Sequence, residues 1–125
     1  GRQVNTPYPT ASGGWVVARA NIAEFLTQKL ADMGLSEKER TDMTSYWIPK
    51  LLKKDMPYYR ISFFQTATMN AFIPMKVTPN PDTAFRVFLD WSPLASVPNV
   101  LPQPQTLTHL VRKGFTLVEW GGLEQ

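Results

Sequence analysis

The sequence contains no cysteine and only one histidine, and these two shortages exclude several kinds of chemistry. Without cysteine the chain can form no disulfide, no thiolate metal site and no cysteine nucleophile. A Ser-His-Asp site would need His109, but no serine lies in a G-x-S-x-G motif. Zinc, EF-hand, P-loop and dinucleotide fingerprints are missing as well. We therefore expect no metal, no cofactor and no catalytic triad.

Long hydrophobic runs and a strong charge of one sign are also lacking. No stretch of 18 or more apolar residues is present, so we expect no transmembrane segment. The 13 basic and 10 acidic residues leave a net charge of +3. That excess is small beside the dense basic patches of nucleic-acid-binding proteins, so the net charge does not favour a nucleic-acid partner.

The composition that remains is typical of one folded domain. The chain has 125 residues, 43% of them hydrophobic, including 7 Phe, 4 Trp and 4 Tyr. This content can offset the conformational entropy that folding costs. Residues 1–13 are rich in Pro, Gly, Ser and Thr, which indicates a flexible leader or a linker. We predict a single α+β domain over residues 14–122, released by Gly121-Gly122 into a tail of residues 123–125.

Two helices are expected in the first half of the domain. Asn21 with Glu24, and Ser36 with Glu39, have the spacing of capping boxes, and apolar residues follow each pair at helical intervals. Together they predict a helical hairpin over about residues 22–54. Pro49 should kink or end its second helix near Ile48.

Strand patterns dominate the second half. Alternation predicts strands over residues 58–64, 83–91 and 114–120. Residues 73–77 suit an edge strand, residues 66–72 are open between a short helix and a loop, and the prolines of residues 92–108 indicate a surface crossing. A short strand at residues 15–17 is a candidate partner for the last strand. The expected fold is α+β, with the helical hairpin on one face of a small antiparallel or mixed sheet.

Aromatic and basic residues supply the candidate binding sites. Trp91 and Trp120 lie at predicted strand ends, where their rings can be partly exposed to a protein or glycan ligand. Tyr58 and Tyr59 are interleaved with basic residues between Lys50 and Arg60, a pattern that can contact phosphate or single-stranded nucleic acid. The alternative is that these lysines only stabilise the C-terminal end of the second helix.

Two carboxylates allow a catalytic alternative. Asp90 and Glu119 could face each other on neighbouring strands, as the acid pair of a glycoside hydrolase does. The favoured alternative is a structural ion pair between Arg86 and Glu119 that stabilises strand pairing.

Four segments, GGWVV, SYWIPKL, TAFRVFLDW and KGFTLVEWGG, resemble a family of uncharacterised domains in secreted or cell-surface proteins of microbes. The likeness covers residues 14–122, and its closing motif has the form G-F-T-x-V-E-W-G-G. It implies an extracellular or cell-envelope location and no reaction. The leading hypothesis is a non-enzymatic extracytoplasmic binding or structural module with a protein or glycan partner. The alternatives are a hydrolase using Asp90 and Glu119, and a weak nucleic-acid binder using Lys50 to Arg60.

Overall fold

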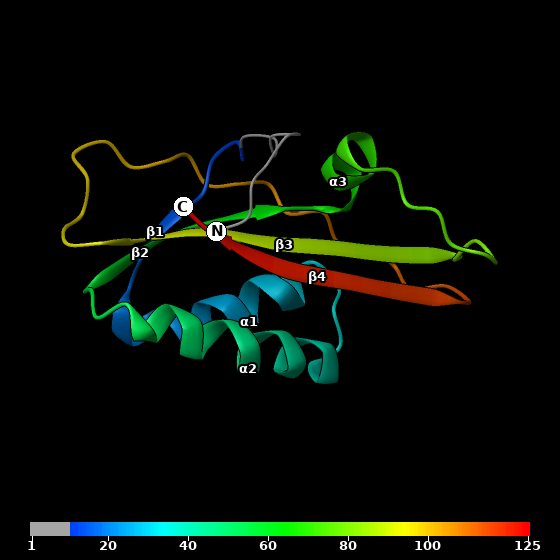
Figure 1. Ribbon diagram of the computed structural model, residues 1–125, viewed down its shortest axis with the longest axis horizontal. Coiled ribbons are helices and arrows are strands. Elements are labelled where there is room, and N and C mark those ends of the chain that lie inside the picture. The colour runs from blue at the N-terminus through cyan, green and yellow to red at the C-terminus, as the bar shows by residue number, and fades with distance from the viewer. Residues whose placement is uncertain (1–10) are drawn as a thin grey trace.

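The computed structural model describes residues 11–125, which form one mixed sheet covered by helices (Figure 1). The elements in chain order are β1 (Trp15–Ala18), the 3-10 helix η1 (Arg19–Asn21), α1 (Ile22–Asp32), α2 (Glu37–Lys53), β2 (Tyr58–Phe64), α3 (Thr66–Phe72), β3 (Thr83–Leu94) and β4 (Thr116–Glu124). The strand order is β1-β2-β3-β4, antiparallel except for the parallel β3–β4 pair. The predicted α+β class and the helical hairpin on one face are therefore confirmed. Residues 1–10 of the leader predicted over residues 1–13 lie outside the described part of the chain.

The start of α2 forms as its sequence predicts, whereas the start of α1 does not. Ser36 Oγ accepts a hydrogen bond from the Glu39 amide at 3.2 Å, and Glu39 Oε1 accepts one from the Ser36 amide at 2.8 Å. Asn21 makes no side-chain cap. Because η1 runs directly into α1, the backbone of Asn21 is already helical, and its side chain is not placed to receive the first free amides.

Pro49 lies inside α2 instead of ending it. The helix continues four residues further, to Lys53. Trp47 and Leu51, on either side of the proline, are 1% and 0% exposed. Burial of these two large side chains against the sheet outweighs the backbone hydrogen bond that the proline removes.

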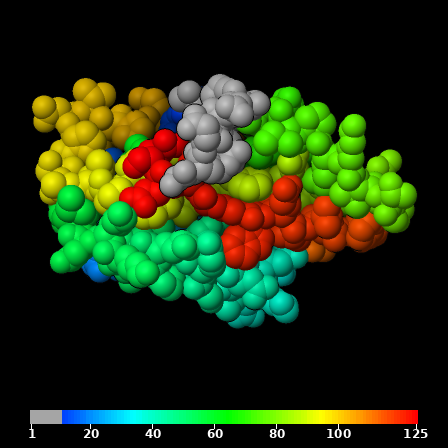
Figure 2. Space-filling view, in the orientation of Figure 1, coloured from blue at the N-terminus to red at the C-terminus, as the bar shows by residue number. Residues whose placement is uncertain are grey.

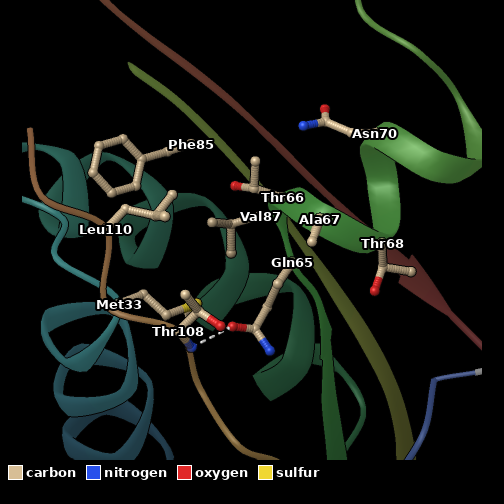
Figure 3. A pocket seen from close by; sticks show the side chains of 10 residues that line it. All are labelled: Met33, Gln65, Thr66, Ala67, Thr68, Asn70, Phe85, Val87, Thr108 and Leu110. Atoms are coloured by element: carbon tan, nitrogen blue, oxygen red, sulfur yellow. Dashed lines mark hydrogen bonds between the residues drawn. The ribbon is translucent and has the colours of Figure 1, made fainter. Parts of the chain in front are cut away.

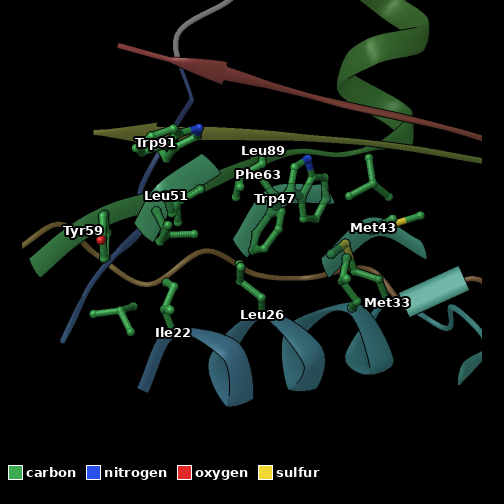
Figure 4. Close-up of a cluster of buried hydrophobic side chains, with 14 of the residues drawn as sticks. Ile22, Leu26, Met33, Met43, Trp47, Leu51, Tyr59, Phe63, Leu89 and Trp91 are labelled. Carbon is green, nitrogen blue, oxygen red and sulfur yellow. The ribbon is translucent and has the colours of Figure 1, made fainter. Parts of the chain in front are cut away.

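The core lies between the helical hairpin and the sheet (Figure 4). Phe85, Val87, Leu89 and Trp91 alternate along β3 toward the helices, and all four are buried, as the strand pattern predicts. The helices contribute the facing side chains, namely Ile22, Leu26, Leu30, Met33, Met43, Trp47 and Leu51. Within the described residues, no helix is long and apolar enough to cross a bilayer.

β1 pairs with β2 and not with the last strand, contrary to the sequence-based expectation. The hairpin of α1 and α2 returns the chain beside its own start, where the Arg19 amide donates to the Pro57 carbonyl at 2.9 Å. β1 is therefore at one edge of the sheet and β4 at the other (Figure 1).

Two other strand predictions need correction. Residues 73–77 form no strand, and the Ile73 carbonyl accepts a hydrogen bond from the Arg86 side chain in place of a strand partner. Gly121 and Gly122 do not release a tail, since β4 continues through them to Glu124. A Cβ at Gly121 would lie 3.0 Å from the Phe88 ring, so glycine permits the close approach of β3 and β4 at this point.

A long irregular segment, residues 95–115, connects β3 to β4, and we call it the crossing segment. It passes β1, where the Gly14 amide donates to the Gln103 carbonyl at 2.7 Å. It then reaches the α1–α2 turn, where the Leu110 amide donates to the Met33 carbonyl at 3.1 Å. Leu107 and Leu110 pack against the core on the way. The segment thus runs along the β1–β2 edge of the sheet and returns to the start of β3, where the Lys113 amide donates to Thr83 Oγ1 at 2.8 Å, consistent with the predicted crossing.

Candidate functional site

A pocket of about 290 Å³ opens where β2 turns into α3 (Figure 3). Its walls come from the first turns of α3, from β3, from the end of α1 and from the crossing segment. The lining residues are Met33, Gln65, Thr66, Ala67, Thr68, Asn70, Phe85, Val87, Thr108 and Leu110. We call this cavity the α3 pocket. Its size is near the lower limit of small-ligand sites.

Hydrogen bonds to β3 position α3 at the pocket. Thr66 Oγ1 accepts from the Arg86 amide at 2.8 Å and donates to the Ala84 carbonyl at 3.3 Å. This hydroxyl therefore continues the pairing of β3 after β2 has ended. Arg86 adds two bonds from its side chain, with Nη1 donating to Asn70 Oδ1 at 3.1 Å and to the Ile73 carbonyl. α3 is thus held at both ends by one residue of the sheet.

Gln65 fixes the opposite wall of the pocket. Its Nε2 donates to the Thr106 carbonyl at 3.0 Å, and its Oε1 accepts from the Thr108 amide at 2.8 Å. The second of these bonds is drawn in Figure 3. Leu110 is held beside Met33 by the backbone bond described above. The crossing segment therefore forms a wall despite lacking regular structure.

The lining of the α3 pocket is that of a binding cavity. None of the ten lining side chains is ionisable: five are apolar, and the others are hydroxyls and amides. Acid–base or nucleophilic catalysis needs a titratable or activated group within reach of the ligand. An apolar floor with a few hydroxyls and amides at its rim instead accommodates an apolar group and orients it.

Trp91 and Tyr59, two of the predicted binding aromatics, are core residues. Trp91 is 4% exposed because it faces the helices, and β3 continues three residues beyond it to Leu94. Tyr59 is fully buried, and its hydroxyl accepts a hydrogen bond from Arg19 Nη1 at 2.7 Å. Burial raises the pKa of Tyr59, although the nearby Arg19 cation acts in the opposite direction. Neither ring is free to stack on a ligand.

Trp120 and Tyr58 are half-buried. The Trp120 ring packs edge-to-face on Tyr46 and Trp47, with centroid distances of 5.5 and 5.8 Å. Trp120 therefore belongs to a contact between α2 and β4. The expected partial exposure is found for Trp120 and not for Trp91.

Arg86 and Glu119 form an ion pair across the parallel strands, with Arg86 Nε 2.7 Å from Glu119 Oε1. They are register partners, and they lie on the sheet face opposite the helical hairpin. The Arg86 side chain is 3% exposed and that of Glu119 is 45% exposed. The ion pair holds the Arg86 side chain in place, and Arg86 in turn holds α3. Glu119 therefore helps to position the α3 wall of the pocket.

Asp90 and Glu119 are not brought together. Asp90 is four residues beyond Arg86, the register partner of Glu119, which separates the two carboxylates by about 13 Å along the strands. Paired glycosidase carboxylates are about 5–9.5 Å apart. Asp90 instead accepts hydrogen bonds from Arg60 at 3.3 Å and from Gln125 at 2.7 Å. The geometry therefore favours structural roles for both acids.

The predicted basic-aromatic cluster is divided by the fold. Arg60 lies on the face opposite the hairpin with Ser62, Asp90 and Ser92, whereas Lys50 and Lys53 lie on α2 at the hairpin face. His109 is an exposed residue of the crossing segment, with Nδ1 3.1 Å from the Asp32 carbonyl oxygen. Among residues 11–125, no group of three His, Asp or Glu side chains is arranged to hold a metal ion.

The sequence interpretation missed the α3 pocket because its walls are distant in the chain. Residues 66–72 are ambiguous by pattern, and residues 106–110 have no periodicity. The usable local signals were Gln65 and Thr66, whose side chains replace backbone partners. Comparison with known proteins adds no identity, since no family model, no curated protein and no solved structure matches the chain.

Proposed function

We propose that the chain is a non-enzymatic extracytoplasmic binding module that receives an apolar group of a protein or glycan partner in the α3 pocket. The observation that carries this proposal is the pocket lining, which is apolar at its floor and contains no ionisable side chain. Its walls are held by Arg86 and Gln65, whose hydrogen bonds form before any ligand arrives. A preformed site of this kind loses little conformational entropy on binding.

Two exposed alanines of α3 provide a matched test. Ala67 lines the pocket, whereas Ala71, one turn later, does not. Ala67→Trp fills the pocket mouth, and Ala71→Trp adds the same bulk to the same helix elsewhere. Peptide and glycan arrays probed with the labelled full chain should show ligands that the wild type and Ala71→Trp retain and that Ala67→Trp loses. Retention by Ala67→Trp, or no ligand for the wild type, would contradict the proposal.

The extracytoplasmic location is part of the proposal and is supported by the resemblance of the GWVV and GFTLVEWGG segments to secreted and surface domains. The absence of cysteine is compatible with any redox compartment. Antibody labelling of intact and permeabilised producing cells tests it. Signal that requires permeabilisation would place the domain inside the cell and contradict this part.

A further inference from the structure

A second cavity lies at the other end of β3, between the C-terminal half of α2 and β4, and we call it the α2–β4 groove. Its volume is about 320 Å³, and its lining includes Tyr46, Trp47, Lys50, Lys53 and Gly122. In Figure 2 the red atoms of β4 lie at the surface beside the cyan-to-green atoms of α2. Trp91 lines this groove and Phe85 lines the α3 pocket. Six residues of strand, about 20 Å, separate them, so the two cavities are distinct.

The groove contains a buried donor without an acceptor. Trp47 is 1% exposed, and its Nε1 has no hydrogen-bond partner within the described part of the chain. The nearby Trp120 ring, edge-to-face at 5.8 Å, can offer only a weak aromatic contact. Leaving such an N–H unpaired costs about 1–3 kcal/mol. An oxygen atom supplied by a ligand would remove that cost.

Gly122 lies close against this donor. A Cβ at this position would lie 3.2 Å from Trp47 Nε1. The backbone of Gly122 is not in the left-handed region, so conformation does not require glycine here. A side chain at this position would crowd the indole N–H, and glycine avoids that contact.

The groove also has an excess of positive charge. Three lysines line it, and its one carboxylate, Glu124, is 3.3 Å from Lys54 Nζ. The Lys50 ammonium lies 4.8 Å from the Tyr46 ring centroid. Within residues 11–125, neither Lys50 nor Lys53 has a carboxylate within 4.0 Å, and residues 1–10 contain no Asp or Glu. Two cations thus remain without a counter-charge at the rim of a cavity with a free donor.

We propose that the α2–β4 groove binds the carboxylate of a small organic acid, such as a sugar acid or an acidic amino-acid residue. Lys50 and Lys53 supply the positive charge, and the Trp47 N–H donates a hydrogen bond to one carboxylate oxygen. Charge-assisted bonds of this kind are about twice as strong as neutral ones. The groove volume accommodates a group the size of one sugar or one amino acid.

The test is an NMR titration of the full-length, ¹⁵N-labelled chain that follows the Trp47 indole N–H signal. The probes are D-glucuronate, N-acetyl-aspartate, D-glucose and inorganic phosphate at constant ionic strength. We expect a saturable downfield shift with one or both carboxylates and none with glucose, and the two acids distinguish a sugar source from a peptide source. No saturable shift with either acid overturns the proposal. An equal shift with phosphate also overturns it, because the lysines would then attract any anion.

Matched variants establish the site. Lys50→Gln with Lys53→Gln should weaken binding by about tenfold or more, whereas Lys76→Gln, an exposed lysine outside the groove, should leave the affinity unchanged. Gly122→Ala should abolish the shift, whereas Gly121→Ala, whose Cβ meets Phe88 and not Trp47, should preserve it. If a glycine variant fails to fold, the lysine pair decides the outcome, and unchanged affinity in the double variant contradicts the assignment.

Discussion

The side-chain amide of Gln105 pairs with the backbone of Phe63 as a neighbouring strand would. Its Oε1 accepts from the Phe63 amide at 2.7 Å, and its Nε2 donates to the Phe63 carbonyl at 2.9 Å. β1 pairs with β2 only as far as Ile61, so this glutamine protects the next part of the edge of β2. The crossing segment therefore stabilises the edge of the sheet through this side chain, although it forms no strand at that point.

Gln105→Ala should lower the free energy of unfolding by about 1–3 kcal/mol, because a half-buried amide and carbonyl of Phe63 lose their partners together. Urea denaturation measures the change. Gln103→Ala is the matched control, since within residues 11–125 Gln103 contributes its backbone carbonyl and not its side chain. Equal losses of unfolding free energy in the two variants would show that the pairing of Gln105 with Phe63 contributes no specific stability.

Elements that rest on local signals could be predicted from the sequence. The Ser36 capping box is complete within four residues, and the alternation of Phe85, Val87, Leu89 and Trp91 correctly identifies the buried face of β3. Pro49 and Asn21 were misinterpreted because their outcomes depend on what surrounds them. Burial of Trp47 and Leu51 stabilises α2 on both sides of the proline. η1 places the backbone of Asn21 in a helical conformation, in which its side chain does not cap α1.

The candidate sites were harder to predict than the fold, because exposure is a tertiary property. Trp91 lies near a strand end in the pattern, yet β3 extends to Leu94 and the Trp91 ring packs in the core under the helical hairpin. The ion pair of Arg86 with Glu119 was accessible to pattern reasoning, since both lie on clear strands. The α3 pocket was not, since its walls meet only after the crossing segment has returned along the edge of the sheet to Gln65 and Met33.

Glu39 links α2 to the crossing segment and should make stability depend on pH. Its carboxylate accepts bonds from Arg112 at 2.5 and 2.9 Å as well as from Ser36. Burial by itself raises the pKa of Glu39, but the bonds from Arg112 and Ser36 outweigh it, and the pKa lies below the ordinary value of 4.5. The charged form is therefore favoured by folding.

Glu39→Gln should lower the free energy of unfolding by about 1 kcal/mol at neutral pH, discounted for partial exposure of the pair. Because the folded pKa is lowered, the difference from wild type should be complete above pH 4.5 and should vanish as the pH falls through the folded value. Urea denaturation across pH 2–7 measures it. Glu24→Gln, at an exposed site on α1, is the control. A constant difference at all pH values would refute the charge-based explanation.

Glu119→Gln should cost about 1–3 kcal/mol, because it leaves the buried Arg86 cation without its counter-charge. Glu124→Gln, on the same strand, should cost under about 1 kcal/mol, because both members of its pair with Lys54 are well exposed. Chemical denaturation gives both values. The same Glu119 variant addresses the hydrolase alternative, which requires that any glycan- or peptide-cleaving activity be lost with this carboxylate.

Replacing Pro49 by alanine should stabilise the protein. The proline is exposed and lies within α2, so it removes the backbone donor that would pair with the Ser45 carbonyl without contributing to the core. Alanine restores the donor and has the best helix propensity, and the intrinsic difference is about 3 kcal/mol. The gain should be smaller, at about 1–2 kcal/mol, because proline also restricts the unfolded chain. Thermal and urea unfolding measure it, with Ser45→Ala as an exposed control one turn earlier. A loss of stability in Pro49→Ala would mean that the path of α2 around the proline is itself needed to seat Trp47 and Leu51 in the core.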